Sequence, residues 1–246
     1  MDRSLYIAMS GAKQTLLAQA SNANNLANSQ TTGFKSDFEQ SRAMPVYGPG
    51  YPSRVYAMAE RPGSDFRQGS IQTTGNDLDV AIKGDGWFAV EGANGKEAYT
   101  RAGDLRITPE GRLEIGSGRA IYGDDGPIVI PAAEKIDIGN DGTISIIPLG
   151  EKETTVAVVG RIKMVKPSFD NLEKLNDGLM YTKNGSKLVV SADVNLVQGA
   201  LEGSNVNAVS ALVEMIELAR NFELQTKVMK NVDDNAGVSA KLMQMA

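Results

Sequence analysis

Residues 207–246 read NAVSALVEMIELARNFELQTKVMKNVDDNAGVSAKLMQMA. Apolar or small residues recur in this stretch at intervals of seven, and a second set fills the alternate positions of the same heptad. The first set is Ala208, Met215, Phe222, Met229, Ala236 and Met243, and the second is Ala211, Leu218, Gln225, Val232 and Ser239. The pattern predicts a long helix that presents a seam to another helix. Asn205 or Asn207 is expected to cap its start, and Gly237 is a position at which it could be interrupted.

The beginning of the chain carries a weaker stripe of the same kind. Its members are Leu5, Met9, Ala12, Leu16, Ala23 and Leu26, with Gln19 as the polar exception. The stripe predicts a helix from Ser4 to Asn28, capped by Ser4 or Asp2. An isolated helix of ~12–15 residues is marginal in water, and this stripe, weakened by Ala12, Gln19 and Ala23, cannot stabilise itself. Each terminal helix therefore needs a partner.

Between the two ends, short alternating runs are separated by turn sequences. Hairpins are predicted at Asn94-Gly95, Pro109-Glu110-Gly111, Asp141-Gly142 and Asn184-Gly185. The expected fold class is therefore α+β and mainly β, with an antiparallel β domain looped out between N- and C-terminal helices that form coiled coils. The expected divisions are an N-terminal helix and motif at 1–35, an extended Pro- and Gly-rich connector at 36–62, the β domain at 63–201 and the C-terminal helix at 202–246.

The composition removes most familiar enzyme chemistry. The 246 residues include no His and no Cys, which excludes a Ser-His-Asp or Cys-His nucleophile, imidazole or thiolate metal sites, and disulfides. A net charge of −5 disfavours nucleic acid as a partner. No apolar run is long enough to span a membrane, and the N-terminal apolar run is too short for a cleaved signal peptide. The protein is expected to be cytoplasmic, or to leave the cell without signal cleavage.

Local motifs give no convincing site for catalysis, a cofactor or a metal. The acidic loop that starts at Asp137 fails as a calcium loop, because Gly139 and Pro148 stand where ligands are required. The run around Gly84 and Gly86 lacks the third Gly of a dinucleotide fingerprint. We therefore expect no catalytic, cofactor-binding or metal-binding residues, and we expect Trp87 and Phe88 to lie in a core.

Three groups of residues resemble the bacterial flagellar axial proteins of the rod and hook. At the N-terminal end the resemblance rests on Asn24-Asn25-Leu26-Ala27-Asn28 and Thr32-Gly33-Phe34-Lys35. At the C-terminal end it rests on Glu202-Gly203-Ser204-Asn205-Val206-Asn207 with Met215, Ile216, Arg220, Phe222 and Glu223. In the middle it rests on Gln68-Gly69-Ser70, on Thr73 to Asp79, on Gly84 to Phe88 and on Tyr99-Thr100-Arg101-Ala102-Gly103-Asp104. The resemblance covers nearly the whole chain, although Ala102 and Leu105 depart from residues that are common in the family.

The resemblance implies a non-enzymatic structural subunit of the flagellar basal body, located in the periplasmic rod. Such a subunit is exported through the flagellar type III apparatus and assembles helically with itself and with other rod subunits into the driveshaft that carries motor torque to the hook. The opening Met1-Asp2-Arg3 and the modest length favour a proximal rod subunit, with a distal rod or another axial subunit as the alternative. The terminal helices would then form the inner tube and the β domain the outer layer.

The residues expected at the assembly interface follow from the two seams and the terminal motifs. They are Leu5, Met9, Leu16, Asn24, Asn25, Leu26, Asn28, Gly33, Phe34, Asn205, Asn207, Met215, Leu218, Arg220, Phe222 and Met229.

Two other classes of function stay open. A carboxylate-dependent or metal-dependent enzyme acting on cell-wall glycan would need two carboxylates roughly 5 to 9.5 Å apart in a cleft. A secreted β-rich adhesin or binding module would need an exposed apolar patch away from the termini.

Overall fold

A computed structural model describes the whole chain except residues 1, 39–40, 48–54, 60–62, 151–154 and 245–246. The chain divides into two compact units. Unit 1 comprises residues 1–29, 36–65 and 206–246, and unit 2 comprises residues 30–35 and 66–205. Both units are therefore assembled from separate stretches of the sequence.

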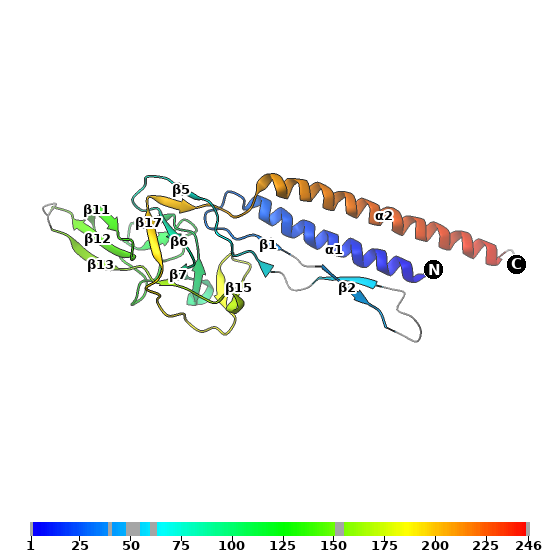
Figure 1. Cartoon of the computed structure of the whole chain (residues 1–246), viewed down its shortest axis with the longest axis horizontal. Coiled ribbons are helices and arrows are strands. Elements are labelled where there is room, and N and C mark those ends of the chain that lie inside the picture. Colours follow the sequence, from blue (N-terminus) through cyan, green and yellow to red (C-terminus); the bar gives the residue numbers. More distant parts are fainter. Residues whose placement is uncertain (1, 39–40, 48–54, 60–62, 151–154, 245–246) are drawn as a thin grey trace. The chain divides into compact units, whose positions relative to one another are not determined.

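Unit 1 is built on two long helices. Helix α1 spans Asp2–Ala27 and helix α2 spans Ala208–Gln244; Figure 1 shows them side by side, with the N-terminal end of α1 and the C-terminal end of α2 pointing the same way. Asn207 caps α2, since its Oδ1 accepts the backbone N–H groups of Val209 and Ser210 at 3.0 and 3.1 Å. Helix α2 runs without interruption past Gly237 to Gln244, so the interruption that Gly237 could cause does not occur.

The segment predicted as an extended connector, 36–62, contains more regular structure than its composition suggested. Strand β1 (Asp37–Phe38) pairs with β4 (Gly63–Ser64), and β2 (Ser41–Pro45) pairs with β3 (Val55–Ala59), in both cases antiparallel. The prediction differed from the structure because it rested on the prolines and glycines of the segment. Pro45 only ends β2, and the others lie at 48–52 and 62, outside the described residues.

Unit 2 holds the antiparallel β structure that the sequence predicted. Strands β14, β7, β8, β16 and β15 form a five-stranded sheet in that order, β11, β12 and β13 form a three-stranded sheet, and β10 with β9, β17 with β6 and β18 with β5 form pairs. Two 3-10 turns, η1 (Ala93–Gly95) and η2 (Phe169–Asn171), interrupt the strands. The strand bounds are β5 Ile71–Thr73, β6 Val80–Lys83, β7 Trp87–Glu91, β8 Glu97–Thr100, β9 Leu105–Ile107, β10 Leu113–Ile115, β11 Ala133–Ile138, β12 Thr143–Pro148, β13 Ala157–Arg161, β14 Met164–Val165, β15 Leu172–Lys174, β16 Met180–Thr182, β17 Asn195–Gln198 and β18 Ala200–Glu202.

Strand β7 lies at the centre of this unit and is buried on both faces. Phe88 and Val90 pack into a large aliphatic cluster, whereas Trp87 and Ala89 pack into a second cluster with Tyr99. The alternation follows from the period of two along a strand. The expectation that Trp87 and Phe88 are core residues is confirmed, with 2 and 0% of their surfaces exposed.

Three of the four predicted hairpins are present. Asn94-Gly95 joins β7 to β8, Pro109-Glu110-Gly111 joins β9 to β10, and Asp141-Gly142 joins β11 to β12. The glycine of each turn has a positive φ, from 70 to 84°, which residues with a side chain rarely adopt.

The hairpin predicted at Asn184-Gly185 is wrong. Strand β16 precedes this turn, but it already lies between β8 and β15 in the five-stranded sheet. Both edges of β16 are therefore paired with these two strands, so residues 187–190 have no edge of β16 to pair with. This run instead reaches the sheet through a bridge from Val190 to Val165 of β14.

Candidate assembly interface

The heptad seam of α2 faces α1 within unit 1. Asn22, 5% exposed, donates its side-chain N–H to the carbonyl oxygen of Ala211 at 2.8 Å. Further along, the side chains of Thr15 and Gln225 are within hydrogen-bond distance in both directions, at 3.3 and 3.1 Å. Ala211 and Gln225 both belong to the predicted seam, so the seam serves first to join the two helices of one chain. Polar pairs inside such a seam fix the register of the helices.

Helix α1 covers this seam only in part. The predicted interface residues on it are all half-buried, namely Met215, Leu218, Phe222 and Met229. On α1, Leu5 and Leu26 are also half-buried, while Met9 and Leu16 are 51 and 48% exposed. The apolar stripe of α1 is thus divided between its partner helix and the surface.

A second set of apolar side chains lies on the outer faces of both helices, and sequence reasoning missed it. Ile216 is 69% exposed and Leu224 is 52% exposed, although both are large and aliphatic. The other members are Tyr6, Leu17, Val209, Leu212, Val213, Val228, Val238 and Leu242. A heptad count finds only the seam and does not detect a second apolar side of the same helix. We call this set, together with Met9 and Leu16, the outer apolar face; large exposed apolar surfaces are rare on monomeric proteins.

The asparagines of the N-terminal motif have structural roles inside unit 1. Asn25 makes two hydrogen bonds to the backbone of Asp37, accepting from its N–H at 2.8 Å and donating to its carbonyl oxygen at 2.6 Å. Asn28 donates its side-chain N–H to the carbonyl oxygen of Asn24 at 2.9 Å, which closes the end of α1. Arg220 and the cap Asn207 lie exposed at α2.

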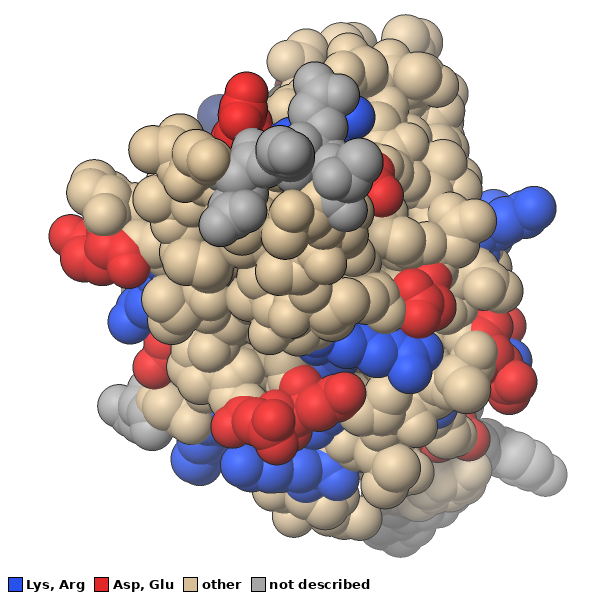
Figure 2. All heavy atoms as spheres, turned by 90° about the vertical axis from the view of Figure 1, so that its left-hand side faces the viewer, with Lys and Arg blue, Asp and Glu red and all other residues tan. Residues whose placement is uncertain are grey.

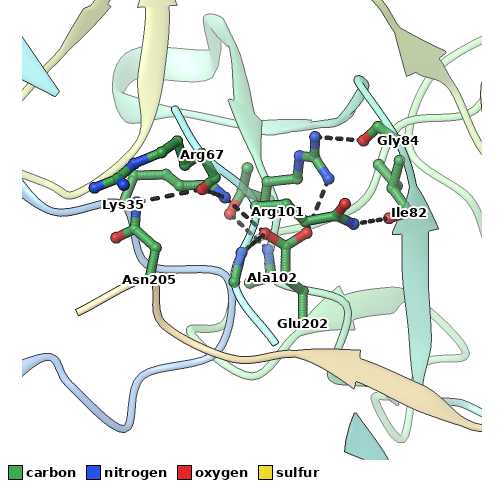
Figure 3. Close-up of polar contacts among 11 residues, drawn as sticks. Lys35, Arg67, Ile82, Gly84, Arg101, Ala102, Glu202 and Asn205 are labelled. Atoms are coloured by element: carbon green, nitrogen blue, oxygen red, sulfur yellow. Dashed lines mark hydrogen bonds and ion pairs between the residues drawn. The ribbon is translucent and has the colours of Figure 1, made fainter. Parts of the chain in front are cut away.

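Unit 2 contains a buried charge cluster formed by Lys35, Arg101 and Glu202, shown in Figure 3 and called the Glu202 cluster here. The carboxylate of Glu202 accepts from Lys35 Nζ at 2.6 Å through Oε1 and from Arg101 at 2.8 Å through Oε2. Each of the three side chains is at most 3% exposed. Sequence reasoning placed these residues in three separate motifs but had no means of pairing positions so far apart.

Backbone groups supply further hydrogen bonds to this cluster, although the buried Nε of Arg101 has no hydrogen-bond partner among the described residues. The N–H of Gly69 donates to Glu202 Oε1 at 3.0 Å, and Lys35 Nζ also donates to the carbonyl oxygen of Arg67 at 2.8 Å. Arg101 donates a second hydrogen bond to the carbonyl oxygen of Gly84 at 2.7 Å. Buried charges are stable only when they are paired and hydrogen-bonded in this way.

The remaining predicted residues lie close to the cluster in unit 2. Gly33 donates its N–H to the carbonyl oxygen of Glu202 at 2.7 Å. The ring of Phe34 lies 3.9 Å from Lys174 Nζ, a cation–π distance, and its carbonyl oxygen accepts from the N–H of Asn205 at 3.3 Å. Gly33, Phe34 and Asn205 therefore hold the N- and C-terminal motifs together on one unit.

Among the described residues, no three or more Asp or Glu side chains gather as a metal site would require, and no helix has the length and apolarity to cross a membrane. Burial raises the pKa of Asp104, and the negative charge of Asp79 raises it further. On the face shown in Figure 2, acidic and basic side chains are interspersed, and the described residues there form no continuous patch of one sign.

Three family models match separate parts of the chain. The model described as flagella basal body rod protein matches residues 5–35, the flagellar hook protein FlgE/F/G D1 domain matches 81–146, and the flagellar basal body rod FlgEFG protein C-terminal region matches 197–242. The first and last contain most of α1 and of α2, and the D1 model covers the centre of unit 2.

Full-length relatives give the same result. The flagellar basal-body rod protein FlgF of Escherichia coli (strain K12) is 42% identical over 100% of both chains, and that of Salmonella typhimurium is 40% identical over 100% of both. The flagellar basal-body rod protein FlgG of Bacillus subtilis is 30% identical over 95% of this chain and 96% of its own. The chain therefore belongs to the family of flagellar basal-body rod proteins, and it is more similar to these FlgF relatives than to this FlgG.

Proposed function

We propose that the chain is a non-enzymatic subunit of the proximal part of the flagellar rod, assembled through the outer apolar face of α1 and α2. The exposure of that face is the observation that supports the proposal. Its residues cannot all be covered within unit 1, because the seam between the helices already uses the inward sides. Copies of the chain and other rod subunits are the proposed partners.

The energetics of burial favour such an interface. Complete burial of a large aliphatic side chain contributes about 1.5–3 kcal/mol, so Ile216 and Leu224, exposed by 69 and 52%, would each contribute roughly 1–2 kcal/mol in a packed wall. Association of two proteins costs on the order of 4–15 kcal/mol in lost freedom. Several such contacts with several neighbours are thus needed, which a helical lattice of subunits provides.

The proximal position rests on the relatives. The FlgF proteins of Escherichia coli and Salmonella typhimurium share 42 and 40% identity with the chain, against 30% for FlgG of Bacillus subtilis. Export by the flagellar type III apparatus belongs to the same proposal, as does transmission of torque from motor to hook. Isolation of intact basal bodies and identification of their subunits tests the position: the chain should be found in the proximal rod.

The interface itself can be mapped by cysteine labelling, because the chain has no Cys of its own. Ile216→Cys should react with a maleimide in the purified monomer and be protected in isolated basal bodies. Val189→Cys is a matched control, because Val189 is 85% exposed and lies in unit 2. Equal labelling of Ile216→Cys in monomer and basal body would exclude the outer apolar face as the interface.

The absence of catalysis is part of the proposal and has its own test. Purified protein should show no turnover of glycan or peptide substrates. The pair of acidic residues most worth testing is Asp79 and Asp104, which form a backbone bridge, and the charge of Asp79 helps to raise the pKa of Asp104. Turnover that disappears in Asp79→Asn or Asp104→Asn would contradict a purely structural role.

A further inference from the structure

The backbone passes between the two units four times. It does so after Ser29, after Lys35, after Asp65 and after Asn205. Every covalent connection between the helices and the β structure is therefore carried by three short segments of unit 2, namely 30–35, the residues that follow 65, and the residues that end at 205. The bonds that hold these three segments on the rest of unit 2 therefore determine how firmly each chain passage is anchored there.

All three segments are bonded to Glu202 or to its immediate partners. Segment 30–35 is held twice, by the N–H of Gly33 on the carbonyl oxygen of Glu202 at 2.7 Å and by Lys35 Nζ on the Glu202 carboxylate at 2.6 Å. The segment that follows residue 65 is held by the N–H of Gly69, which donates to the same carboxylate at 3.0 Å. Glu202 itself belongs to the segment that leaves the unit at 205.

A second set of bonds links the segments to one another around the carbonyl oxygen of Arg67. This oxygen accepts from Lys35 Nζ at 2.8 Å and from the side-chain N–H of Asn205 at 3.2 Å. Nearby, the N–H of Gly203 donates to the carbonyl oxygen of Ser70 at 2.8 Å. Figure 3 shows Lys35, Arg67 and Asn205 converging on one point, with Glu202 beside them.

Arg101 ties this arrangement to the core of unit 2. It binds the Glu202 carboxylate at 2.8 Å, and its guanidinium lies 5.6 Å from the centre of the Trp87 ring, which is part of the buried β7 strand. A buried carboxylate flanked by two cations contributes little net stability compared with apolar residues of the same shape. What it contributes is a fixed geometry, because one carboxylate is shared by both cations, and removing it would leave two buried cations without a counter-charge.

We infer that Glu202 is a positioning residue, because the bonds to it hold in place the three segments of unit 2 that carry all four chain passages. Force that passes between the helical and the β parts of the subunit is then carried by this cluster. The mechanical part of this inference rests on the proposed function as a rod subunit. The structural part does not, because it concerns only which segments are held by which bonds.

Two variants separate fastening from folding. Lys35→Met keeps the volume of a buried side chain and the ion pair between Glu202 and Arg101, but it removes one of the two bonds that hold segment 30–35 on Glu202, and the Gly33 N–H bond remains. Glu202→Gln removes the carboxylate charge from all partners at once. The control is Glu97→Gln, because Glu97 also forms an ion pair in unit 2, with Lys163 at 2.8 Å and side chains 5 and 13% exposed, but in strand β8, away from these segments.

Hydrogen exchange measured along the full-length chain gives the decisive readout. Lys35→Met and Glu202→Gln should accelerate exchange in residues 30–36, 66–70 and 200–205 by about 10- to 100-fold, since a hydrogen bond to a charged group is lost. Strands β7 and β8 should keep their wild-type protection. Glu97→Gln should leave the three segments unchanged.

Two results would overturn the inference. One is unchanged exchange in the three segments of Lys35→Met. The other is a parallel loss of protection in β7 and β8 of that variant, global unfolding included, because the cluster would then be part of the core and not a fastening.

Motility tests the mechanical part separately. Cells that carry Lys35→Met should build flagella and lose swimming speed more steeply than wild type as the viscosity of the medium rises. Equal speeds at every viscosity would exclude force transmission through the cluster. If the wild-type chain were absent from purified basal bodies, the proposed function would fail, whereas the exchange result would still decide the fastening.

Discussion

Gly33 occupies a backbone position that no residue with a side chain can share. Its φ is +66°, and a Cβ built there would lie 2.3 Å from the backbone nitrogen of Ala102 and 2.3 Å from the carbonyl carbon of Arg101. Neither neighbour can rotate away, because both atoms are main chain. Gly33→Ala should therefore destabilise unit 2 by more than the ~1–3 kcal/mol that a left-handed conformation alone costs.

Gly95 provides the control for this substitution. Its φ is +70°, but no described atom lies within 4 Å of the place that a Cβ would take, so Gly95→Ala should show the conformational cost alone. Thermal unfolding of both variants checks the difference. Equal shifts in melting temperature would show that the close approach of Gly33 to Arg101 and Ala102 does not constrain the fold.

Asp104 should make the stability of unit 2 depend on pH in an unusual direction. Burial, assisted by the charge of Asp79, raises the pKa of Asp104 in the folded state. The folded protein therefore holds this proton more tightly than the unfolded chain, so the carboxylate destabilises the fold above its folded pKa and stops doing so below its unfolded pKa. Asp104→Asn should raise the melting temperature at neutral pH, and the gain should shrink as the pH falls toward the ordinary range of an Asp.

This prediction is tested by measuring the melting temperatures of the wild type and of Asp104→Asn at the same series of pH values. A gain that stays constant from neutral to acidic pH would mean that the substitution acts through packing against Gly116 and not through charge. The two residues do lie close together, since a Cβ on Gly116 would be 1.8 Å from Asp104 Oδ2.

Residue-level prediction from the sequence succeeded where one residue acts alone and failed where partners come from distant positions. Asn207 was one of two candidates for the cap of α2, because capping depends on its next few neighbours. Lys35 and Glu202 are 167 positions apart, and their pairing depends on the completed fold. The sequence shows a Lys and a Glu inside the two terminal motifs, but it does not show that they form a buried pair.

Among the elements, the helices and three hairpins were predictable because their signals are local. A period of seven over α2 and a turn dipeptide between two alternating runs each specify structure without reference to the rest of the chain. The hairpin at Asn184-Gly185 failed because β16 has its neighbours, β8 and β15, from elsewhere in the sheet. The outer apolar face was missed because a heptad count assigns one seam to a helix, and α2 has apolar residues on two sides.

The two sides of α2 can be separated by a pair of substitutions two residues apart, because that spacing places the side chains on opposite sides of the helix. Phe222 is half-buried in the seam, so Phe222→Ala should cost unit 1 roughly half of the ~3–5 kcal/mol that a fully buried Phe loses. Leu224 is 52% exposed on the outer apolar face. Leu224→Ser should change the stability of the monomer by no more than about 0.5 kcal/mol and yet reduce incorporation into basal bodies.

Helix melting by circular dichroism, together with a motility assay, distinguishes these effects. Cells with Leu224→Ser that swim normally would remove the outer apolar face from the assembly. A large loss of helix stability in the same variant would show that Leu224 packs within unit 1.

For the molecule as a whole, the boundaries expected at 35, 62 and 201 describe changes in sequence pattern, whereas the compact units follow contacts. Segment 30–35 groups with the β structure through Gly33 and Lys35, and residues 36–65 group with the helices. A division of the sequence into consecutive ranges cannot describe the two units, because each unit is assembled from separate stretches. Because the stretches of the two units alternate along the sequence, the chain must pass between the units four times.

The two units should unfold separately in the isolated monomer. Unit 2 has a continuous aliphatic core and a second cluster around Trp87, whereas unit 1 consists of two helices that leave their outer apolar face exposed and two short strand pairs. Helices of this kind derive most of their stability from packing, and unit 1 lacks the neighbours that assembly would supply. Heating should therefore lower the helical circular dichroism first. The fluorescence of Trp87, which is the single Trp of the chain, should change at a higher temperature with the core of unit 2.

Limited proteolysis of the same monomer should agree with the melting curves. Cleavage is expected first at Lys and Arg residues exposed on α2, such as Arg220 and Lys227, and a fragment close to Phe66–Asn205 should persist. In assembled rods the order should change, because burial of the outer apolar face adds stability to unit 1 by mass action. A single transition shared by both spectroscopic signals, with cleavage at equal rates in both units, would mean that the monomer is one cooperative body. The helices would then be stable before assembly, and the exposed apolar face would not be what limits them.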